Sequence, residues 1–443
     1  MRRRNIFHLC IQISVLTVLA FLYGLSLLLS PPAYWESVAV SAVLLVLFGA
    51  GCIRLVPVAS AWLLGEEPHL SREGERTFRR CGTRELFKLF LIVLFVRLLE
   101  FPLTYIVHFL LFGYGGTFFE IQRLWLDFYH PEIAFPLYGW LSNIFWIVTV
   151  NFNHARFIGS YFFTTLAVVA LYYLVQLDFD RKTARRAVRY FLVMPFALSL
   201  MGTVPDGLFL LFSIVTLILL RKNRFAFANL AAFFAVLTHA IGVLLIVPIL
   251  ASYISYLIGN VRLNRVTGKG YVLRQVFNTL SVLLIPAGVG LVMLYSYLRF
   301  GDALQLYSHM LGTSGVGLSG LFRFSDAAFS ELRFVGGSSF AVFAATYLPQ
   351  FAYLVFGLVM LLLACHTIPT AFSLLMAVTL PMIVATGHVS AAARIITMTA
   401  PFCITLAVRV KKRWADALVN VLLLILWIAY FFAFIAGYTG ETI

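Results

Sequence analysis

Apolar runs of roughly 17 to 25 residues recur along the chain from residue 9 to residue 438, with short polar segments between them. A helix of that length crosses about 30 Å of hydrocarbon, and no segment between the runs is long enough for a soluble domain. The pattern predicts an all-α polytopic membrane protein with about thirteen transmembrane helices. The predicted spans are residues 9–30, 38–63, 89–113, 157–177, 190–203, 205–220, 226–238, 240–258, 276–298, 341–364, 368–386, 394–409 and 416–438.

The composition agrees with this class, since 62% of the residues are hydrophobic and 12% are charged, whereas soluble domains carry about 25% charged residues. The N-terminal segment MRRRNIFHLCIQISVLTVLAFLYGLSLLLS starts with basic residues, as a signal peptide does. Its apolar core is too long for a signal peptide and no small-residue cleavage site follows it, so we expect a retained first helix.

The net charge of +15 follows from where the Lys and Arg residues lie. With the N-terminus inside, the inner segments hold 25 of the 33 Lys and Arg residues, which is the bias typical of cytoplasmic loops. Six of them lie in the loop at residues 65–88. The basic excess is therefore a topology signal, and we expect no nucleic-acid partner.

The five cysteines lie in predicted spans or on the inner side, and no two of them lie within four residues of each other. We therefore expect neither disulfides nor a cysteine metal cluster. They are Cys10, Cys52, Cys81, Cys365 and Cys403.

Three outer segments are long or unusually polar and are candidates for a shared site: residues 114–156, 203–206 and 299–340. In the first, ionisable side chains alternate with Phe, Trp and Tyr, which is typical of a packed loop, although a solvated loop at a membrane surface would also be polar. The segment continues with FPLYGWLSNIFWIVTV, which fits a helix lying in the membrane interface or dipping into it. The ionisable residues are Glu120, Arg123, Asp127, His130 and Glu132.

Four stretches resemble the GT-C superfamily of membrane glycosyltransferases and, within it, the PIG-V-type mannosyltransferases and their bacterial relatives. They are WLDFYHPEIAFPLYGWL at 125–141, TVPDGLFLLFSIVTLILLRKNRFAFANLAAFFAVLTHAIGVLLIVPIL at 203–250, LRFGDALQLYSHM at 298–310 and AARIITMTAPFCITLA at 392–407. The stretches follow the order of the family motifs. By this resemblance, residues 89–443 form a GT-C-like core, 65–88 a basic cytoplasmic loop and 1–64 an additional N-terminal helix pair.

The stretches also depart from the family pattern. Leu126 separates Trp125 from Asp127, Gly139 replaces a proline, and His239 stands where an arginine is common. The identity of the sugar donor and of the acceptor therefore stays open.

GT-C enzymes, as the resemblance implies, move a sugar from a polyprenyl phosphate to an acceptor hydroxyl, with inversion, on the extracytoplasmic side. The hydroxyl needs a carboxylate base within about 3 Å, and the phosphate needs cations or backbone donors, with a divalent cation such as Mg²⁺ or Mn²⁺ as an option. The implied partners are a polyprenyl-phosphate-linked mannose or other hexose, a lipid or glycan acceptor, and membrane lipids. The implied location is a bacterial plasma membrane, or the endoplasmic reticulum membrane in a eukaryote.

Asp127 is the first candidate for the base, because it stands between Trp125 and the FPLY stretch, in the order of the family motif. Glu120 is the second candidate, and Glu132 and Asp206 remain further options. Asp127 and Glu120 are about two helical turns apart, so they would face the same cleft if this segment is helical.

Candidates for substrate binding come from the same outer side. Arg394 matches the late arginine of the family, and an interfacial anchor is its alternative role. His239 lies at a turn between two spans, where a structural histidine is the alternative. Arg123 either binds substrate or pairs with an acidic residue of its own loop.

Asp206 follows Pro205 at the start of a predicted span, where it either caps the helix or belongs to the site. Asp302 and His309 belong to a Gly- and Ser-rich segment that fits a lid or an acceptor-binding loop. Arg97 and Glu100 lie three residues apart within a span, and this spacing predicts a structural pair turned into the bundle.

The sequence therefore predicts a glycosyltransferase that depends on a lipid-phosphate sugar, with no assigned metal ligands. The alternatives are a transporter or flippase for a lipid-linked or polar solute and a ligase for a lipid-linked glycan. A transporter is expected to carry inverted repeats and polar residues at mid-membrane depth, whereas the polar clusters of this chain lie on one predicted face.

Overall fold

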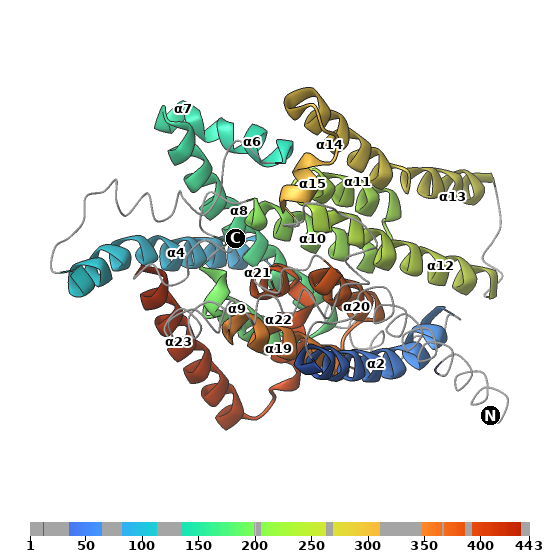
Figure 1. Cartoon of the computed structure of the whole chain (residues 1–443). Coiled ribbons are helices and arrows are strands. Elements are labelled where there is room, and N and C mark those ends of the chain that lie inside the picture. The colour runs from blue at the N-terminus through green and yellow to red at the C-terminus, as the bar shows by residue number, and fades with distance from the viewer. Residues whose placement is uncertain are drawn as a thin grey trace.

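The structure of the chain is a computed structural model (Figure 1). It describes residue 12 and residues 35–63, 82–112, 135–198, 200, 205–262, 269–310, 348–365, 367–385 and 392–435. All regular elements in this part of the chain are helices, so the predicted all-α class is confirmed for it.

The described residues form a series of helices along the chain, in which η denotes a 3₁₀-helix. The first half contains α2 (Trp35–Leu63), α4 (Thr83–Phe112), α6 (Pro136–Ser142), η2 (Asn143–Phe145), α7 (Trp146–Thr149), α8 (Phe152–Asp178), α9 (Arg181–Leu192), η3 (Pro195–Ala197) and α10 (Asp206–Arg221). The second half contains α11 (Phe225–Val236), η5 (Ala240–Leu245), α12 (Ile246–Arg262), α13 (Lys269–Ser281), α14 (Leu284–Phe300), α15 (Gln305–Met310), α19 (Leu348–Ala364), α20 (Thr370–Ala385), α21 (Ala392–Met398), α22 (Ala400–Arg409) and α23 (Arg413–Ile435).

Six helical segments of the described residues are long and apolar enough to cross a membrane, and α21 with α22 adds a seventh if this bent pair counts as one span. Such segments identify a membrane protein. The remaining predicted spans correspond to shorter helices or lie outside the described residues, so the count of about thirteen stays a prediction. The six segments are Leu45–Trp62, Thr83–Leu110, His154–Asp178, Ala240–Val261, Gly270–Phe300 and Arg413–Ile435.

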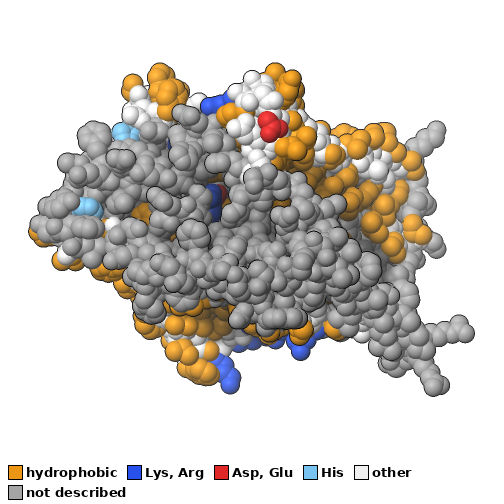
Figure 2. Space-filling model, in the orientation of Figure 1, with side chains coloured by type: hydrophobic (Ala, Val, Ile, Leu, Met, Phe, Trp, Pro, Cys, Tyr) orange, Lys and Arg blue, Asp and Glu red, His pale blue; other side chains and the backbone are white. Residues whose placement is uncertain are grey.

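The centre of the bundle is built around α8, the most buried of the candidate spans. It packs along α10, and α10 packs along α11. In Figure 1, α2, α13, α14 and α23 lie at the edges. Their outward side chains are hydrophobic and exposed, as on Leu273, Leu298 and Leu422, and Figure 2 shows hydrophobic side chains covering the α12 to α14 region. Lipid tails tolerate such a surface, whereas water does not.

The stretch at residues 190–203, predicted to span the membrane, is not one continuous helix. Helix α9 ends at Leu192, and Met194 adopts an extended conformation before the 3₁₀ turn η3. Pro195 explains the break, because a proline disfavours helical geometry in the residue before it and has no N–H to donate. The hydropathy of this stretch reflects burial within the protein.

Side chains of neighbouring helices bind the backbone of this broken stretch. Ser160 and Thr164 donate hydrogen bonds to the carbonyl oxygen of Leu200, at 2.7 and 3.1 Å, and Arg97 donates one to Ala197 at 3.3 Å. Irregular backbone at membrane depth requires such partners. Arg97 also pairs with Glu100 at 3.5 Å, and both side chains are buried, so the predicted structural pair is confirmed.

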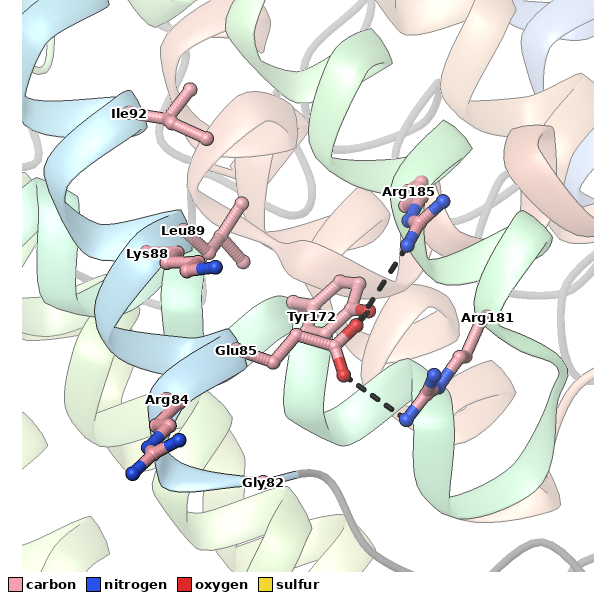
Figure 3. A pocket seen from close by; sticks show the side chains of 9 residues that line it. All are labelled: Gly82, Arg84, Glu85, Lys88, Leu89, Ile92, Tyr172, Arg181 and Arg185. Carbon is pink, nitrogen blue, oxygen red and sulfur yellow. Dashed lines mark hydrogen bonds and ion pairs between the residues drawn. The ribbon is translucent and has the colours of Figure 1, made fainter.

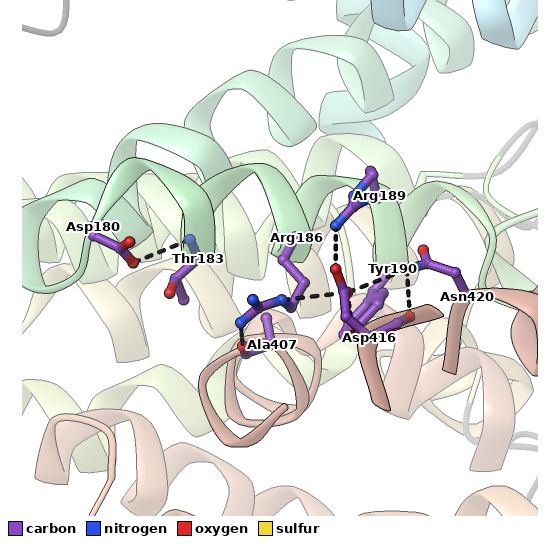
Figure 4. A network of polar contacts seen from close by, with 8 residues as sticks. All are labelled: Asp180, Thr183, Arg186, Arg189, Tyr190, Ala407, Asp416 and Asn420. Atoms are coloured by element: carbon purple, nitrogen blue, oxygen red, sulfur yellow. Dashed lines mark hydrogen bonds and ion pairs between the residues drawn. The ribbon is translucent and has the colours of Figure 1, made fainter. Parts of the chain in front are cut away.

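Basic side chains gather at one end of the bundle, which we call the basic face: the start of α4, helix α9, residues 221–224 and residues 409–413. Ion pairs link α9 to the starts of α4 and α23. Asp416 at the start of α23 pairs with Arg186 at 3.3 Å and Arg189 at 2.8 Å, and Tyr190 donates a hydrogen bond to it at 2.8 Å (Figure 4). These contacts fix α9 against the start of α23.

Candidate functional site

The starts of α10 and α21 meet in a buried ion pair away from the basic face. Helix α10 runs from Asp206 to Arg221, so Asp206 lies about 24 Å from the basic end of its helix. Arg394 on α21 donates from Nε to Oδ2 of Asp206 at 2.5 Å and from Nη2 to Oδ1 at 2.9 Å. This bidentate geometry is the strongest form of an arginine–carboxylate contact.

The ion pair occupies both carboxylate oxygens of Asp206. The side chain is fully buried, and Arg394 is the partner that the described part of the chain gives it. Both carboxylate oxygens accept hydrogen bonds from Arg394, so Asp206 is poorly placed to take a proton from an acceptor. The carboxylate instead fixes the orientation of the guanidinium group.

The same pair shows where Arg394 points. Its side chain is 14% exposed and reaches into the bundle, so it is not an anchor extended toward lipid headgroups. A guanidinium held by a buried carboxylate, with part of its surface accessible, can bind an anion such as a phosphate.

A sharp bend follows the helix that carries Arg394. Helices α21 and α22 meet at 74°, with Thr399 between them in a non-helical conformation. Pro401 at the start of α22 accounts for the break, because it has no N–H to continue the α21 hydrogen-bond ladder. The predicted span at residues 394–409 is therefore a bent pair.

His239 lies beside the ion pair and caps η5. Its Nδ1 accepts a hydrogen bond from the backbone N–H of Ile241 at 3.2 Å, and its ring centroid lies 5.3 Å from that of Phe209. The charges of Asp206 and Arg394 both act on this buried ring. The structural role, which the sequence left as the alternative for His239, is thus observed. Because Nδ1 accepts, the neutral ring carries its proton on Nε2.

Two glycines permit the close packing around the ion pair. A Cβ atom on Gly207 would lie 2.1 Å from Oγ1 of Thr164, where α10 crosses α8. A Cβ atom on Gly242 would lie 2.6 Å from the backbone of Ala235, where η5 turns back under α11. Any larger residue at either position would push the elements apart.

One hydrophobic cluster joins described residues of two predicted outer segments, 114–156 and 299–340. Leu137 of the FPLY stretch donates its backbone N–H to the carbonyl oxygen of Leu237 at 3.2 Å, next to the His239 turn. Phe135 packs edge-on against Tyr307 of α15, with ring centroids 5.4 Å apart. The first and third predicted outer segments therefore meet in this cluster, and the shared site of all three segments stays a prediction. The buried members are Phe135, Leu137, Tyr138, Phe163, Leu208, Leu237, Ala240, Val292, Leu306 and Tyr307.

The apolar segment predicted to lie in the interface folds into α6, η2 and α7. Tyr138 and Ser142 face the protein, and Tyr138 donates a hydrogen bond to the carbonyl oxygen of Arg156 at 2.6 Å. The opposite side is apolar and exposed, with Trp140 at 60% and Ile147 at 78%. The predicted helical conformation is confirmed, in three consecutive pieces, and the two-sided character of the segment suits a membrane interface.

Tyr307 is a buried polar group that the sequence pattern did not reveal. Its hydroxyl has no hydrogen-bond partner among the described residues, and burial raises the pKa of this group. The hydroxyl therefore stays protonated and can donate a hydrogen bond to a ligand. A tyrosine in an aromatic-rich chain gives no distinctive signal, which explains the omission.

The remaining candidates divide into exposed and undescribed residues. Asp302 is exposed and accepts a hydrogen bond from the N–H of Leu304 at 2.9 Å, which shapes the turn before α15. His309 lies on α15, but its side chain is outside the described residues. Glu120, Arg123 and Asp127 also lie outside them.

Within the described ranges, no group of three His, Cys, Asp or Glu side chains is arranged to hold a metal ion. Asp206 is already engaged by Arg394. Any divalent cation at this site would need carboxylates from elsewhere, and residues 113–134 carry Glu120, Asp127 and Glu132.

Comparison with models of known protein families gives no match, and comparison with curated proteins gives none either.

Proposed function

We propose that this chain is a GT-C-type glycosyltransferase that uses a polyprenyl-phosphate sugar, with the basic face in the cytoplasm. The Asp206–Arg394 pair carries the proposal. It supplies a fixed cation where the starts of α10 and α21 meet, beside a cluster that joins the FPLY stretch, the His239 turn and α15. A phosphate leaving group requires such a cation.

In this mechanism, Arg394 stabilises the negative charge that develops on the lipid phosphate, and Asp206 positions Arg394. The base comes from the loop before Phe135, with Asp127 first and Glu120 second. Asp127 lies eight residues before Phe135, so an extended chain allows it to lie at most about 28 Å away. The base then takes the proton of the acceptor hydroxyl as the sugar transfers with inversion.

The test is transfer by the purified full chain in detergent with a panel of polyprenyl-phosphate hexoses, mannose first, against the same sugars as nucleotide conjugates. We expect transfer from a lipid donor only. Arg394→Lys keeps the charge but loses the bidentate contact, so its turnover should fall by roughly 10- to 100-fold. Transfer from a nucleotide sugar without a lipid intermediate would overturn the proposal.

A lipid flippase or transporter is the second candidate, and the bend of 74° between α21 and α22 favours it. Transporters bind substrates at broken helices with charged side chains near the break, and Arg394 lies on one arm of this bend. Proteoliposomes that move a fluorescent polyprenyl phosphate between leaflets without sugar transfer would support this alternative.

A further inference from the structure

A cavity of about 660 Å³ opens at the basic face, between the first turns of α4 and α9 (Figure 3). It lies at the opposite end of the bundle from the Asp206–Arg394 pair, and the proposed function does not use it. Cationic side chains from both helices line it: Arg84 and Lys88 on α4, and Arg181 and Arg185 on α9.

Among the described residues that line the cavity, Glu85 is the single carboxylate. It pairs with Arg181 at 3.1 Å and with Arg185 at 3.9 Å, and Tyr172 donates a hydrogen bond to it at 2.5 Å. Figure 3 shows both arginines reaching toward Glu85 across the cavity. One carboxylate cannot neutralise four cations, so the cavity keeps a positive charge and attracts anions.

The two cations of α4 are the ones most available to a ligand. Both side chains are exposed, and neither Arg84 nor Lys88 forms an ion pair within the part of the chain that the structure describes. Their helix also presents an apolar surface one turn further on. Ile92 lines the cavity and is 59% exposed, and Phe95 beyond it is 63% exposed.

The arrangement has two parts, a basic cavity and an apolar strip that leads away from it along a candidate membrane span. A soluble phosphate would use only the first part. A phospholipid uses both, because its phosphate binds the cations while its acyl chain lies along the apolar strip.

We propose that this cavity binds the headgroup of an anionic phospholipid from the leaflet at the basic face. The phosphate lies between Arg84 and Lys88 on one side and the Glu85-held arginines on the other, and an acyl chain follows Ile92. The bound lipid joins α4 to α9, two helices that otherwise meet at the cavity through Glu85.

The test is native mass spectrometry of the full chain after exchange into mixed micelles of phosphatidylcholine and phosphatidylglycerol. We expect preferential retention of phosphatidylglycerol. Arg84→Ala/Lys88→Ala should weaken that retention by roughly 10- to 30-fold. Each of the two basic residues is expected to strengthen the binding of an anionic lipid by a similar factor, and the two factors multiply. Lys411→Ala/Lys412→Ala removes the same charge from the same face outside the cavity, and it should retain the lipid.

Two outcomes would overturn the proposal: equal retention by both double variants, or equal retention of the two lipids by the unsubstituted protein. Thermal unfolding in phosphatidylcholine alone checks that the cavity variant is folded, and Lys88→Gln serves if it is not. Soluble glycerol phosphate forms a separate arm. If it protects the protein against unfolding as well as phosphatidylglycerol does, the site recognises free phosphate and the lipid assignment is wrong.

Discussion

Arg394 donates two hydrogen bonds to the carboxylate of Asp206, a residue 188 positions earlier in the chain. Asp206 has no exposure to solvent, and Arg394 retains little. Removal of either partner would leave an unpaired charged group in this buried place, which is costly. The pair therefore fixes α21 against α10.

Removal of one partner should cost more stability than removal of both. Asp206→Asn leaves the charge of Arg394 without its carboxylate, and we expect the free energy of unfolding to fall by about 3 kcal/mol. The double variant Asp206→Asn/Arg394→Gln leaves no unpaired charge and should lose less. Thermal unfolding in detergent measures both. A double variant that is less stable than either single variant would show that the charges are not coupled in this way.

Gly207 tests the close approach of α10 to α8. In Gly207→Ala the new methyl group would overlap Oγ1 of Thr164, and relief of the overlap must move one helix or rotate the Thr164 side chain. We expect a loss of about 1 to 3 kcal/mol in the free energy of unfolding. Gly139→Ala on α6 is the matched control, because a Cβ atom there meets nothing within 4 Å. If the two variants unfold at the same temperature, the packing at Gly207 is looser than described.

Local patterns in the sequence were sufficient for some of these features. The three-residue spacing of Arg97 and Glu100 predicted a pair, because residues at that spacing share a helix face. The FPLYGWLSNIFWIVTV segment predicted a helix lying in the membrane interface or dipping into it, and the segment is helical, as α6, η2 and α7. Both features depend on residues that are close together in the chain, so the local sequence is sufficient to predict them.

Other features depend on contacts between distant residues. Asp206 and Arg394 were both candidates, but nothing in their local surroundings indicated that they pair. Hydropathy predicted a span at residues 190–203, since it cannot distinguish a stretch buried in protein from one buried in lipid. The location of the base stays a prediction, because Asp127 and Glu120 lie outside the described residues.

Asp180 caps the N-terminus of α9 at the basic face. Its Oδ1 accepts a hydrogen bond from the backbone N–H of Thr183 at 3.1 Å (Figure 4). Burial raises the pKa of Asp180, but the hydrogen bonds at the helix start and the charge of Arg186 lower it more, so the net pKa lies below the ordinary 3.8. The cap therefore contributes fully above the ordinary pKa, and the contribution is lost as the pH falls through the lower pKa of the folded state.

Asp180→Ala should lower the free energy of unfolding by about 1 kcal/mol at pH 7, and the difference from the unsubstituted protein should shrink as the pH falls below the ordinary pKa of 3.8. Asp180→Asn keeps an N-cap acceptor without the charge, so it should remain close to the unsubstituted protein at pH 7. Thermal unfolding across this pH range measures the differences. If the stability difference between Asp180→Ala and the unsubstituted protein grows as the pH falls, the pKa of Asp180 is not lowered in the folded protein.

The orientation of the chain can be tested with two exposed positions at opposite ends of the bundle. Lys412 lies on the basic face, and Asp302 follows the far end of α14. In sealed right-side-out vesicles, Asp302→Cys should react with a membrane-impermeant maleimide, and Lys412→Cys should react only after permeabilisation. The unsubstituted protein gives the background from the native cysteines. The reverse pattern would put the basic face outside and remove the basis for an extracytoplasmic site.

The last prediction concerns the carboxylate that deprotonates the acceptor hydroxyl. Asp127→Asn keeps the shape and the hydrogen-bonding capacity of the side chain but cannot accept the proton, so turnover of the lipid donor should fall by roughly 10²- to 10⁴-fold. Thermal stability should change little, since the proposed role of this group is chemical. Glu120→Gln is the matched control and should cost less. If Glu120→Gln abolishes transfer while Asp127→Asn stays active, Glu120 is the base. If both variants turn over normally, neither Asp127 nor Glu120 is the base, and Glu132 is then the carboxylate of the loop before Phe135 that remains to be substituted.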